Sequence, residues 1–146
     1  MSQSYDDPRH NGVVAVVVRE ERFLVIRRSD KVIAPGMICF PGGGIENDES
    51  EEGTLVREIR EELGVTITPV RRIWRSVTPW EVKLAWWLGR IDNGQALAPN
   101  PAEVASAHWV SVEEMRAMPN LLESMHQFLD ALESGEIDLD TRASFD

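Results

Sequence analysis

The residues of this sequence that are best suited to chemistry are three consecutive glycines and the acidic residues that follow them. Residues 42–44 are glycines, residues 45–50 read IENDES, and residues 57–63 read REIREEL. Glycine lets a backbone come close to a ligand because it has no side chain, and carboxylate oxygens bind hard divalent cations. The stretch therefore predicts a site at which backbone and carboxylate oxygens share a metal ion.

Three glutamates of this stretch fall on one side of a predicted helix. At about 100° per residue, Glu58, Glu61 and Glu62 share a stripe that borders the apolar side of the helix. Like charges three or four residues apart destabilise a helix by about 0.2–0.5 kcal/mol per pair. A cation such as Mg²⁺ would offset this repulsion. The alternative without a ligand is a solvated acidic face.

The spacing of these residues resembles the Nudix box, G-x5-E-x7-R-E-U-x-E-E-x-G-U, in which U is an aliphatic residue. The sequence matches every specified position between Gly43 and Val65, and a weaker resemblance extends over roughly residues 13–132. The resemblance implies an α/β fold, the Nudix αβα sandwich, with a mixed sheet between helices. In that fold the box forms a loop–helix–loop.

The resemblance also implies an activity and a metal site. Most Nudix proteins hydrolyse a diphosphate bond in a nucleoside diphosphate linked to another group, X, and they need Mg²⁺ or Mn²⁺. Glu58, Glu61 and Glu62 match the glutamates that bind the metal, and the Gly42 carbonyl matches a backbone ligand of the metal. This chain is therefore expected to be a pyrophosphohydrolase with a divalent cation as cofactor.

The catalytic residues implied by the resemblance are Arg57, Glu61, Glu62 and Glu103. Arg57 matches the arginine that orients the acids, and Glu49 matches the glutamate that this arginine contacts. The position of Glu103 is one at which many relatives have a glutamate that binds a further metal or acts as base. The sequence leaves open which glutamate is the general base, how many metals bind and which phosphorus is attacked.

The predicted substrate-binding residues are Arg27, Arg28, Gly42 and Gly43. The two arginines end a predicted strand, so alternation places one on each face and lets one reach a substrate phosphate. The alternative is that both are surface residues. The backbone of the two glycines is expected to approach the phosphates as part of a turn.

The nature of X is not determined by the sequence. Stacking of a base on Trp80 or Trp87 is one hypothesis, because both tryptophans belong to a cluster on a predicted hairpin. The segment TPW at residues 78–80 differs from the longer SQPWPFP motif of Nudix proteins that cleave NADH, so that substrate is not assigned.

The alternatives to hydrolysis are a nucleotide sensor and an isomerase. A non-catalytic Nudix-fold sensor of nucleotides often has an eroded box, whereas the box here is complete. An isomerase of prenyl diphosphates has its own cysteine and glutamate outside the box, and the single Cys39 fits that arrangement poorly. Formation of a phosphate-bearing cleavage product would separate hydrolysis from both.

The elements that must position these residues follow from periodicity and from turn residues. Ser50 is expected to cap the acidic helix and Gly64 to end it, and Asn120 with Glu123 is expected to cap the last helix. The predicted strands are residues 13–20, 22–28, 37–40, 65–76, 80–91 and 107–110, and the predicted helices are residues 50–63, 111–115 and 120–132.

The chain of 146 residues is long enough for one domain. We expect a Nudix domain at residues 12–133, a polar leader at residues 1–11, and an acidic tail at residues 134–146 that frays from Glu136 onward.

Composition narrows the choice of partners. A net charge of −10 argues against nucleic-acid polymers and anionic membranes as partners. A lone cysteine forms no internal disulfide, residues 1–12 lack the pattern of a signal peptide, and the apolar run at residues 13–18 is too short to cross a bilayer. These features predict a cytoplasmic protein that acts on a small nucleotide, with a homodimer left open.

Overall fold

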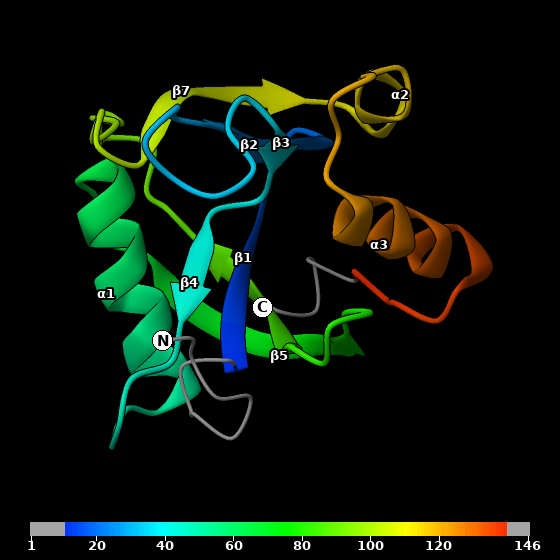
Figure 1. Cartoon of the computed structure of the whole chain (residues 1–146), viewed down its shortest axis with the longest axis horizontal. Helices are drawn as coiled ribbons and strands as arrows, with labels where there is room; N and C mark the ends of the chain where they lie inside the picture. Colours follow the sequence, from blue (N-terminus) through cyan, green and yellow to red (C-terminus); the bar gives the residue numbers. More distant parts are fainter. Residues whose placement is uncertain (1–10, 140–146) are drawn as a thin grey trace.

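The computed structural model of the chain describes residues 11–139, which form a mixed sheet between helices (Figure 1). The strands are β1 (Asn11–Arg19), β2 (Arg22–Arg28), β3 (Ile38–Cys39), β4 (Gly42–Gly44), β5 (Thr68–Val77), β6 (Lys83–Arg90) and β7 (Val104–Val110), and the helices are α1 (Glu51–Leu63), α2 (Val112–Arg116) and α3 (Glu123–Ser134). Every predicted strand has a counterpart, with ends shifted by up to three residues.

The sheet is mixed because one central pair of strands is parallel. Its order is β3-β2-β1-β6-β5, with β4 paired to β1 and β7 paired to β2. β1 and β6 run parallel, whereas the other pairs are antiparallel. β1 and β2 form a hairpin, and the predicted hairpin that carries the tryptophans is present as β5 and β6.

Helices cover both faces of the sheet, as two adjacent tryptophans of β6 illustrate. The indole Nε1 of Trp87 donates to Glu51 of α1 over 2.8 Å. Trp86, the preceding residue, points to the other face and stacks on Phe128 of α3 with 5.1 Å between ring centroids. The αβα sandwich is therefore confirmed, with α1 and α3 on opposite sides of the central strands (Figure 1).

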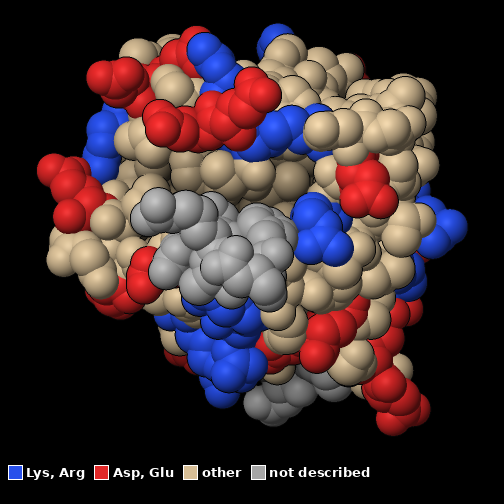
Figure 2. All heavy atoms as spheres, turned by 180° about the vertical axis from the view of Figure 1, so that it is seen from behind, with Lys and Arg blue, Asp and Glu red and all other residues tan. Residues whose placement is uncertain are grey.

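The surface of the molecule carries charges of both signs. The face shown in Figure 2 has acidic and basic side chains in separate patches rather than one continuous basic surface. Within residues 11–139, no helix has the length and apolar character that crossing a membrane requires.

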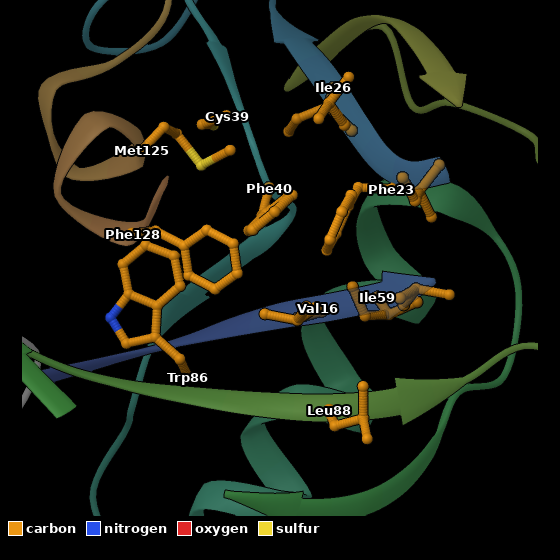
Figure 3. Packing of buried hydrophobic residues seen from close by; sticks show 14 of the residues in the cluster. Val16, Phe23, Ile26, Cys39, Phe40, Ile59, Trp86, Leu88, Met125 and Phe128 are labelled. Atoms are coloured by element: carbon orange, nitrogen blue, oxygen red, sulfur yellow. The ribbon is translucent and has the colours of Figure 1, made fainter. Parts of the chain in front are cut away.

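Aromatic side chains form the centre of the core (Figure 3). Phe40 lies edge-to-face with Phe128 at 5.1 Å and with Trp86 at 6.1 Å, and it stacks on Phe23 at 5.7 Å. Such pairs contribute about 0.5–1.5 kcal/mol each beyond the burial of their area. Since Phe40 is two residues before β4, this packing fixes the point at which the glycine strand begins.

The acidic helix begins and ends as predicted. The Ser50 hydroxyl accepts a hydrogen bond from the Gly53 amide at 2.9 Å. Gly64 has φ 69°, and its amide donates to the Arg60 carbonyl at 3.0 Å. Glycine suits this position because side chains disfavour the left-handed conformation. The register of α1, and with it the direction of each glutamate, is thereby set at both ends.

The predicted start of the last helix was wrong. Its N-cap is Leu122 rather than Asn120, and no side chain caps it. Residues 120–122 instead pair with β3, because the Ile38 amide donates to the Asn120 carbonyl at 2.8 Å and the Leu122 amide donates to the Ile38 carbonyl at 2.9 Å. The Asn120 side chain donates to the Gly36 carbonyl at 2.8 Å and so ties the loop before β3 to this segment.

The three glycines were expected in a turn but form strand β4. Gly44, Gly43 and Gly42 lie opposite Gly12, Val13 and Val14 of β1 in an antiparallel pair. The pairing is possible because residues without side chains fit between β1 and α1, as the geometry of the site shows below.

The first part of the predicted tail is folded onto the sheet, which contradicts the expected fraying from Glu136. Ile137 is buried, and Glu136 accepts a hydrogen bond from Trp74 Nε1 at 2.8 Å. Arg71 donates to the Asp138 carbonyl at 3.1 Å. Residues 140–146 of the tail and residues 1–10 of the leader lie outside the described residues.

Candidate active site

The glycine strand lies against the carboxylates of α1 so closely that no side chain would fit. A methyl group on Gly43 would overlap the carboxyl group of Glu58, and one on Gly42 would overlap the Val13 carbonyl of β1. The Gly42 amide also donates to Glu62 at 3.3 Å. The two glycines predicted to approach the substrate therefore line the same site as the acids.

Three carboxylates meet beside this strand. Oxygens of Glu58, Glu62 and Glu103 lie within 4.8 Å of one another. Glu58 and Glu62 are one turn apart on α1 and are 9% and 5% exposed, while Glu103 is half-buried and precedes β7. Carboxylate oxygens in this number and spacing are the donor set that a hard divalent cation takes.

Backbone hydrogen bonds at the end of α1 bring Glu103 to the helix. The last carbonyls of a helix lack partners within it. Here the Asn100 amide donates to the Glu62 carbonyl at 2.9 Å, and the Ala98 amide donates to the Leu63 carbonyl at 2.8 Å. The Glu103 amide then donates to the Asn100 carbonyl at 2.9 Å, which closes a turn and directs this residue to the cluster.

Ionising both buried carboxylates costs free energy, and a bound cation would lower that cost. Burial, followed by repulsion from Glu58, raises the pKa of Glu62 to about 9. Burial likewise raises the pKa of Glu58, although Arg57 opposes the shift. Two acids of the same helix are therefore hard to ionise together without additional positive charge. This cost, together with the oxygen-only donor set, fits Mg²⁺ or Mn²⁺.

Arg57 connects the acids with the segment before the helix. Its Nε donates to Glu49 Oε2 at 2.6 Å and its Nη2 to Glu49 Oε1 at 3.0 Å, a bidentate pair. Its Nη1 donates to Glu58 at 3.1 Å and to Glu61 at 3.2 Å, and its Nη2 also reaches the Gly44 carbonyl at 3.0 Å. One guanidinium therefore joins helix, strand and loop, and the contact expected with Glu49 is present.

Two details of this network were not predicted. Thr54, which is fully buried, donates from its hydroxyl to Glu49 at 2.8 Å. Hydrogen bonds from Arg57 and from the Glu46 amide lower the pKa of Glu49 to about 2. The position of Thr54, one turn after the Ser50 cap, is the only sequence signal for its role.

Glu61 lies apart from the three grouped carboxylates. Its side chain is 48% exposed and pairs with Arg57. The resemblance placed it beside Glu58 and Glu62 as a metal ligand, whereas the group of close oxygens contains Glu103 in its place. Glu61 lies near the edge of the acidic region and is reached from solvent.

A cavity of about 230 Å³ opens on the other side of β4. Its lining includes Gly42 to Gly44, Arg28, Cys39 and Trp86. Arg28 donates from Nε to the Ile33 carbonyl at 2.6 Å and directs Nη1 to Cys39 Sγ at 3.9 Å. Of the two arginines predicted to meet the substrate, Arg28 therefore faces this cavity, whereas Arg27 is exposed.

A second cavity, of about 420 Å³, lies next to the first one and shares lining residues with it. Arg28 and Leu84 belong to both linings, and the far end is formed by Ile33, Pro79 and Trp80. Ile33 is 86% exposed and Trp80 is 54% exposed, so this end presents apolar side chains to solvent. We name these two joined cavities the substrate groove.

Of the two tryptophans proposed to stack on a base, Trp80 lines the substrate groove and Trp87 does not. Trp87 lies on the face covered by α1, where it donates to Glu51. The prediction that one of these two residues could stack on a base therefore remains only for Trp80. Leu84 was not predicted as a site residue, since an isolated apolar residue in a strand carries no sequence signal for a groove.

A comparison with known families decides the relationship that this geometry suggests. A profile of the NUDIX domain matches residues 8–132. The chain belongs to the Nudix hydrolase family. Its Nudix box contains Gly43, Glu49, Arg57, Glu58 and Glu62, which are the residues that the contacts above bring together.

Curated relatives of this Nudix chain have several names. The NAD-capped RNA hydrolase NudC of Stutzerimonas stutzeri (strain A1501) is 31% identical over 112 residues, which are 77% of this chain and 40% of that protein. The CTP pyrophosphohydrolase of Escherichia coli (strain K12) is 41% identical over 56 residues, 38% of this chain and 42% of that protein. The chain spans about two fifths of the length of these relatives.

Solved structures share the Nudix fold. The MutT protein from Methanosarcina mazei Go1 has a TM-score of 0.69 and 24% identity, over 91% of this chain and 99% of that one. A UDP-X diphosphatase has a TM-score of 0.66 and 19% identity, over 86% of this chain and 63% of that one. At these identities the likeness establishes the arrangement of sheet and helices.

Proposed function

We propose that this protein hydrolyses a diphosphate bond in a nucleoside diphosphate linked to another group, X, with Mg²⁺ or Mn²⁺ as cofactor. The observation that carries this proposal is the meeting of Glu58, Glu62 and Glu103 beside a strand of glycines. Buried acids at this spacing lower the stability of a protein unless a ligand compensates them. The membership of the Nudix family indicates that the compensating ligand is catalytic.

The metal would be held by Glu58 and Glu62, together with Glu61 of the Nudix box and the Gly42 carbonyl just before it, as the family resemblance implies. When bound, such a cation neutralises diphosphate charge, orients phosphorus and lowers the pKa of a water molecule. The protein contributes the positions of these oxygens. Arg57 holds the Glu58 carboxylate at 3.1 Å and the Gly44 carbonyl at 3.0 Å, and so keeps α1 and β4 in register.

The reaction needs a group that takes a proton from water. The water oxygen forms a bond to one phosphorus, the bridging P–O bond breaks, and two phosphate-bearing products leave. Glu103 is the most exposed of the three grouped carboxylates and makes no ion pair with Arg57. We therefore assign proton transfer to Glu103, with Glu62 as the alternative.

The substrate groove suggests how the rest of the molecule is held. Arg28, at the junction of the two cavities, would bind a phosphate oxygen of the substrate, and the apolar end at Ile33 and Trp80 would receive a flat group such as a base. The names of the relatives include NAD-capped RNA, CTP and UDP-X as substrates, and these share a nucleotide with a diphosphate. We propose that class for this chain and leave X open.

A panel of substrates tests the proposal. Nucleoside triphosphates, ADP-ribose, sugar nucleotides, dinucleoside polyphosphates, NADH and coenzyme A are incubated with Mg²⁺ or Mn²⁺, and phosphate-bearing products are measured by chromatography. We expect cleavage of at least one compound and no cleavage after chelation of the metal. If no compound is cleaved with either metal, the chain is better described as a nucleotide-binding protein.

A further inference from the structure

A third, smaller cavity adjoins the substrate groove at its other end. It measures about 70 Å³ and shares Gly12 and Leu84 with the first cavity. Leu84 lines all three cavities, and Glu51 of α1 lines only the small one. Trp80 lines the second cavity, whereas Arg75 and Lys83 line the small one.

The small cavity carries an excess of positive charge in a chain of net charge −10. Arg75 and Lys83 line it, and the single carboxylate among its lining residues is Glu51. Glu51 is shared, since it accepts from Arg75 at 3.3 Å and from Arg72 at 3.3 Å. Lys83 forms no ion pair with any residue between 11 and 139. Among the lining residues, two cations therefore accompany one carboxylate, which Arg72 also binds from outside the lining.

The position of these cations relative to the acidic cluster follows from helix geometry. Glu51 and Glu58 are seven residues apart on α1, which places them on the same side of the helix at a separation of about 10 Å along its axis. A phosphate bound at Arg75 and Lys83 would therefore lie about one nucleoside away from the diphosphate at the acids.

We propose that Arg75 and Lys83 form a binding site for a phosphate monoester carried by the substrate, separate from the diphosphate that is cleaved. A phosphate monoester has a charge of about −1.5 to −2 at neutral pH, which is opposite in sign to the net charge of the lining residues. A cavity of about 70 Å³ holds a small oxyanion but no nucleoside. This inference rests on the proposed function, because it names a feature of X.

Pairs of substrates that differ by one phosphate test this site. Coenzyme A and dephospho-coenzyme A differ by a 3′-phosphate, and NADPH and NADH differ by a 2′-phosphate. For at least one pair we expect kcat/KM to favour the phosphorylated member by at least tenfold. The double variant Arg75→Ala/Lys83→Ala should bring that ratio close to one. A wild-type ratio near one in both pairs, or an unchanged ratio in the double variant, would overturn the proposal.

Two further variants control for loss of charge or folding. Lys31→Ala removes the other lysine of the chain, which lines none of the three cavities, and should keep the wild-type ratio. Lys83→Arg keeps the charge and should keep most of the preference. A loss of the preference in Lys31→Ala equal to that in the double variant would show that overall charge, rather than this cavity, is responsible.

A binding measurement separates this site from the proposed hydrolysis. Calorimetry with adenosine 3′,5′-bisphosphate and with AMP needs no turnover. Tighter binding of the bisphosphate that disappears in Arg75→Ala/Lys83→Ala supports the site even if the wild-type protein cleaves no compound of the panel. Equal affinity for the two ligands in the wild-type protein overturns the site even if hydrolysis is observed.

Discussion

The acidic cluster and the apolar end of the substrate groove differ in how firmly their side chains are held. Glu58 and Glu62 are buried, Gly43 leaves no room beside Glu58, and Arg57 binds it directly. Trp80 and Ile33 are more than half exposed. In the acidic cluster the side chains are held in one conformation by their neighbours. At the apolar end the side chains expose apolar area to solvent.

This difference suggests a division of roles between the two regions. Chemistry at phosphorus needs oxygens in fixed positions, because small displacements of reacting groups cost large factors in rate. Recognition of X by apolar contact tolerates more change, because its energy depends on area more than on angle. Substitutions in the acidic cluster should therefore affect kcat strongly, and substitutions at the apolar end should affect KM moderately.

The largest effect is expected for Glu62→Gln. It removes a carboxylate that we assign to the metal site and should lower kcat/KM by roughly a thousandfold. The metal-free variant should be at least as stable as the wild-type protein. A pKa raised to about 9 means that Glu62 costs stability as pH rises from its unfolded pKa of about 4.5 toward 9, and glutamine avoids this cost.

Steady-state kinetics and thermal unfolding at pH 6 and pH 8 check both statements. Glu52→Gln, which changes an exposed acid of the same helix outside the box positions, is the matched control. Near-normal activity of Glu62→Gln would remove the basis for assigning catalysis to this cluster.

The next effect is expected for Gly43→Ala. The added methyl group overlaps the Glu58 carboxyl group, so either β4 or α1 must move. Overpacking of this kind costs about 1–3 kcal/mol, and the displaced carboxylate should lower kcat by roughly a hundredfold. Gly94→Ala, whose methyl group would meet nothing within 4 Å, should behave like the wild-type protein.

Differential scanning calorimetry measures the stability of these two variants, and steady-state kinetics measures their kcat. If Gly43→Ala unfolds at the wild-type temperature and keeps full activity, the fit between glycine strand and acid is not needed.

A smaller effect is expected at the apolar end. Trp80→Ala removes an aromatic surface worth about 0.5–1.5 kcal/mol, so KM for the best substrate should rise by roughly three- to tenfold, with a smaller change in kcat. Val77→Ala, at an exposed apolar residue outside the groove linings, provides the control. A large loss of kcat in Trp80→Ala with an unchanged KM would contradict the division of roles.

The smallest effect is expected for the substitution Glu49→Gln, measured as a change in stability at acid pH. The pKa of Glu49 is lowered to about 2 by its hydrogen bonds with Arg57. Its contribution to stability is therefore present above its unfolded pKa of about 4.5 and is lost as pH falls toward 2. Between pH 5 and pH 3 the Tm of the wild-type protein should fall more steeply than that of Glu49→Gln. Parallel curves for both proteins would mean that this pair adds nothing to stability.

Much of the fold and of the acidic cluster could be predicted from the sequence because their signals are local. Ser50 and Gly64 define α1, and the order of residues in the box places Glu58 and Glu62 on one side of it. The glycine strand could not be predicted as a strand, since its pairing with β1 depends on a partner 30 residues away.

Other features depended on contacts between distant segments. Asn120 looks like a helix cap, but its backbone is used by β3, which no periodicity indicates. Glu103 was expected at the site only through the family resemblance. Hydrogen bonds from Asn100 to α1 bring it there, and no local pattern in the sequence indicates these contacts. The groove residue Leu84 was missed for the same reason.

The parallel pairing of β1 with β6 has a consequence for the order of assembly during synthesis. Asn11 pairs with Lys83, and the register continues to Val17 and Gly89. The strand that supports the glycines therefore lacks its central neighbour until about 90 residues have left the ribosome, although the whole box has emerged much earlier. Nascent chains that end near Trp80 should bind Mn²⁺ no better than unfolded protein, whereas chains extended past Val110 should bind it; strong binding by the shorter chains would refute this late assembly.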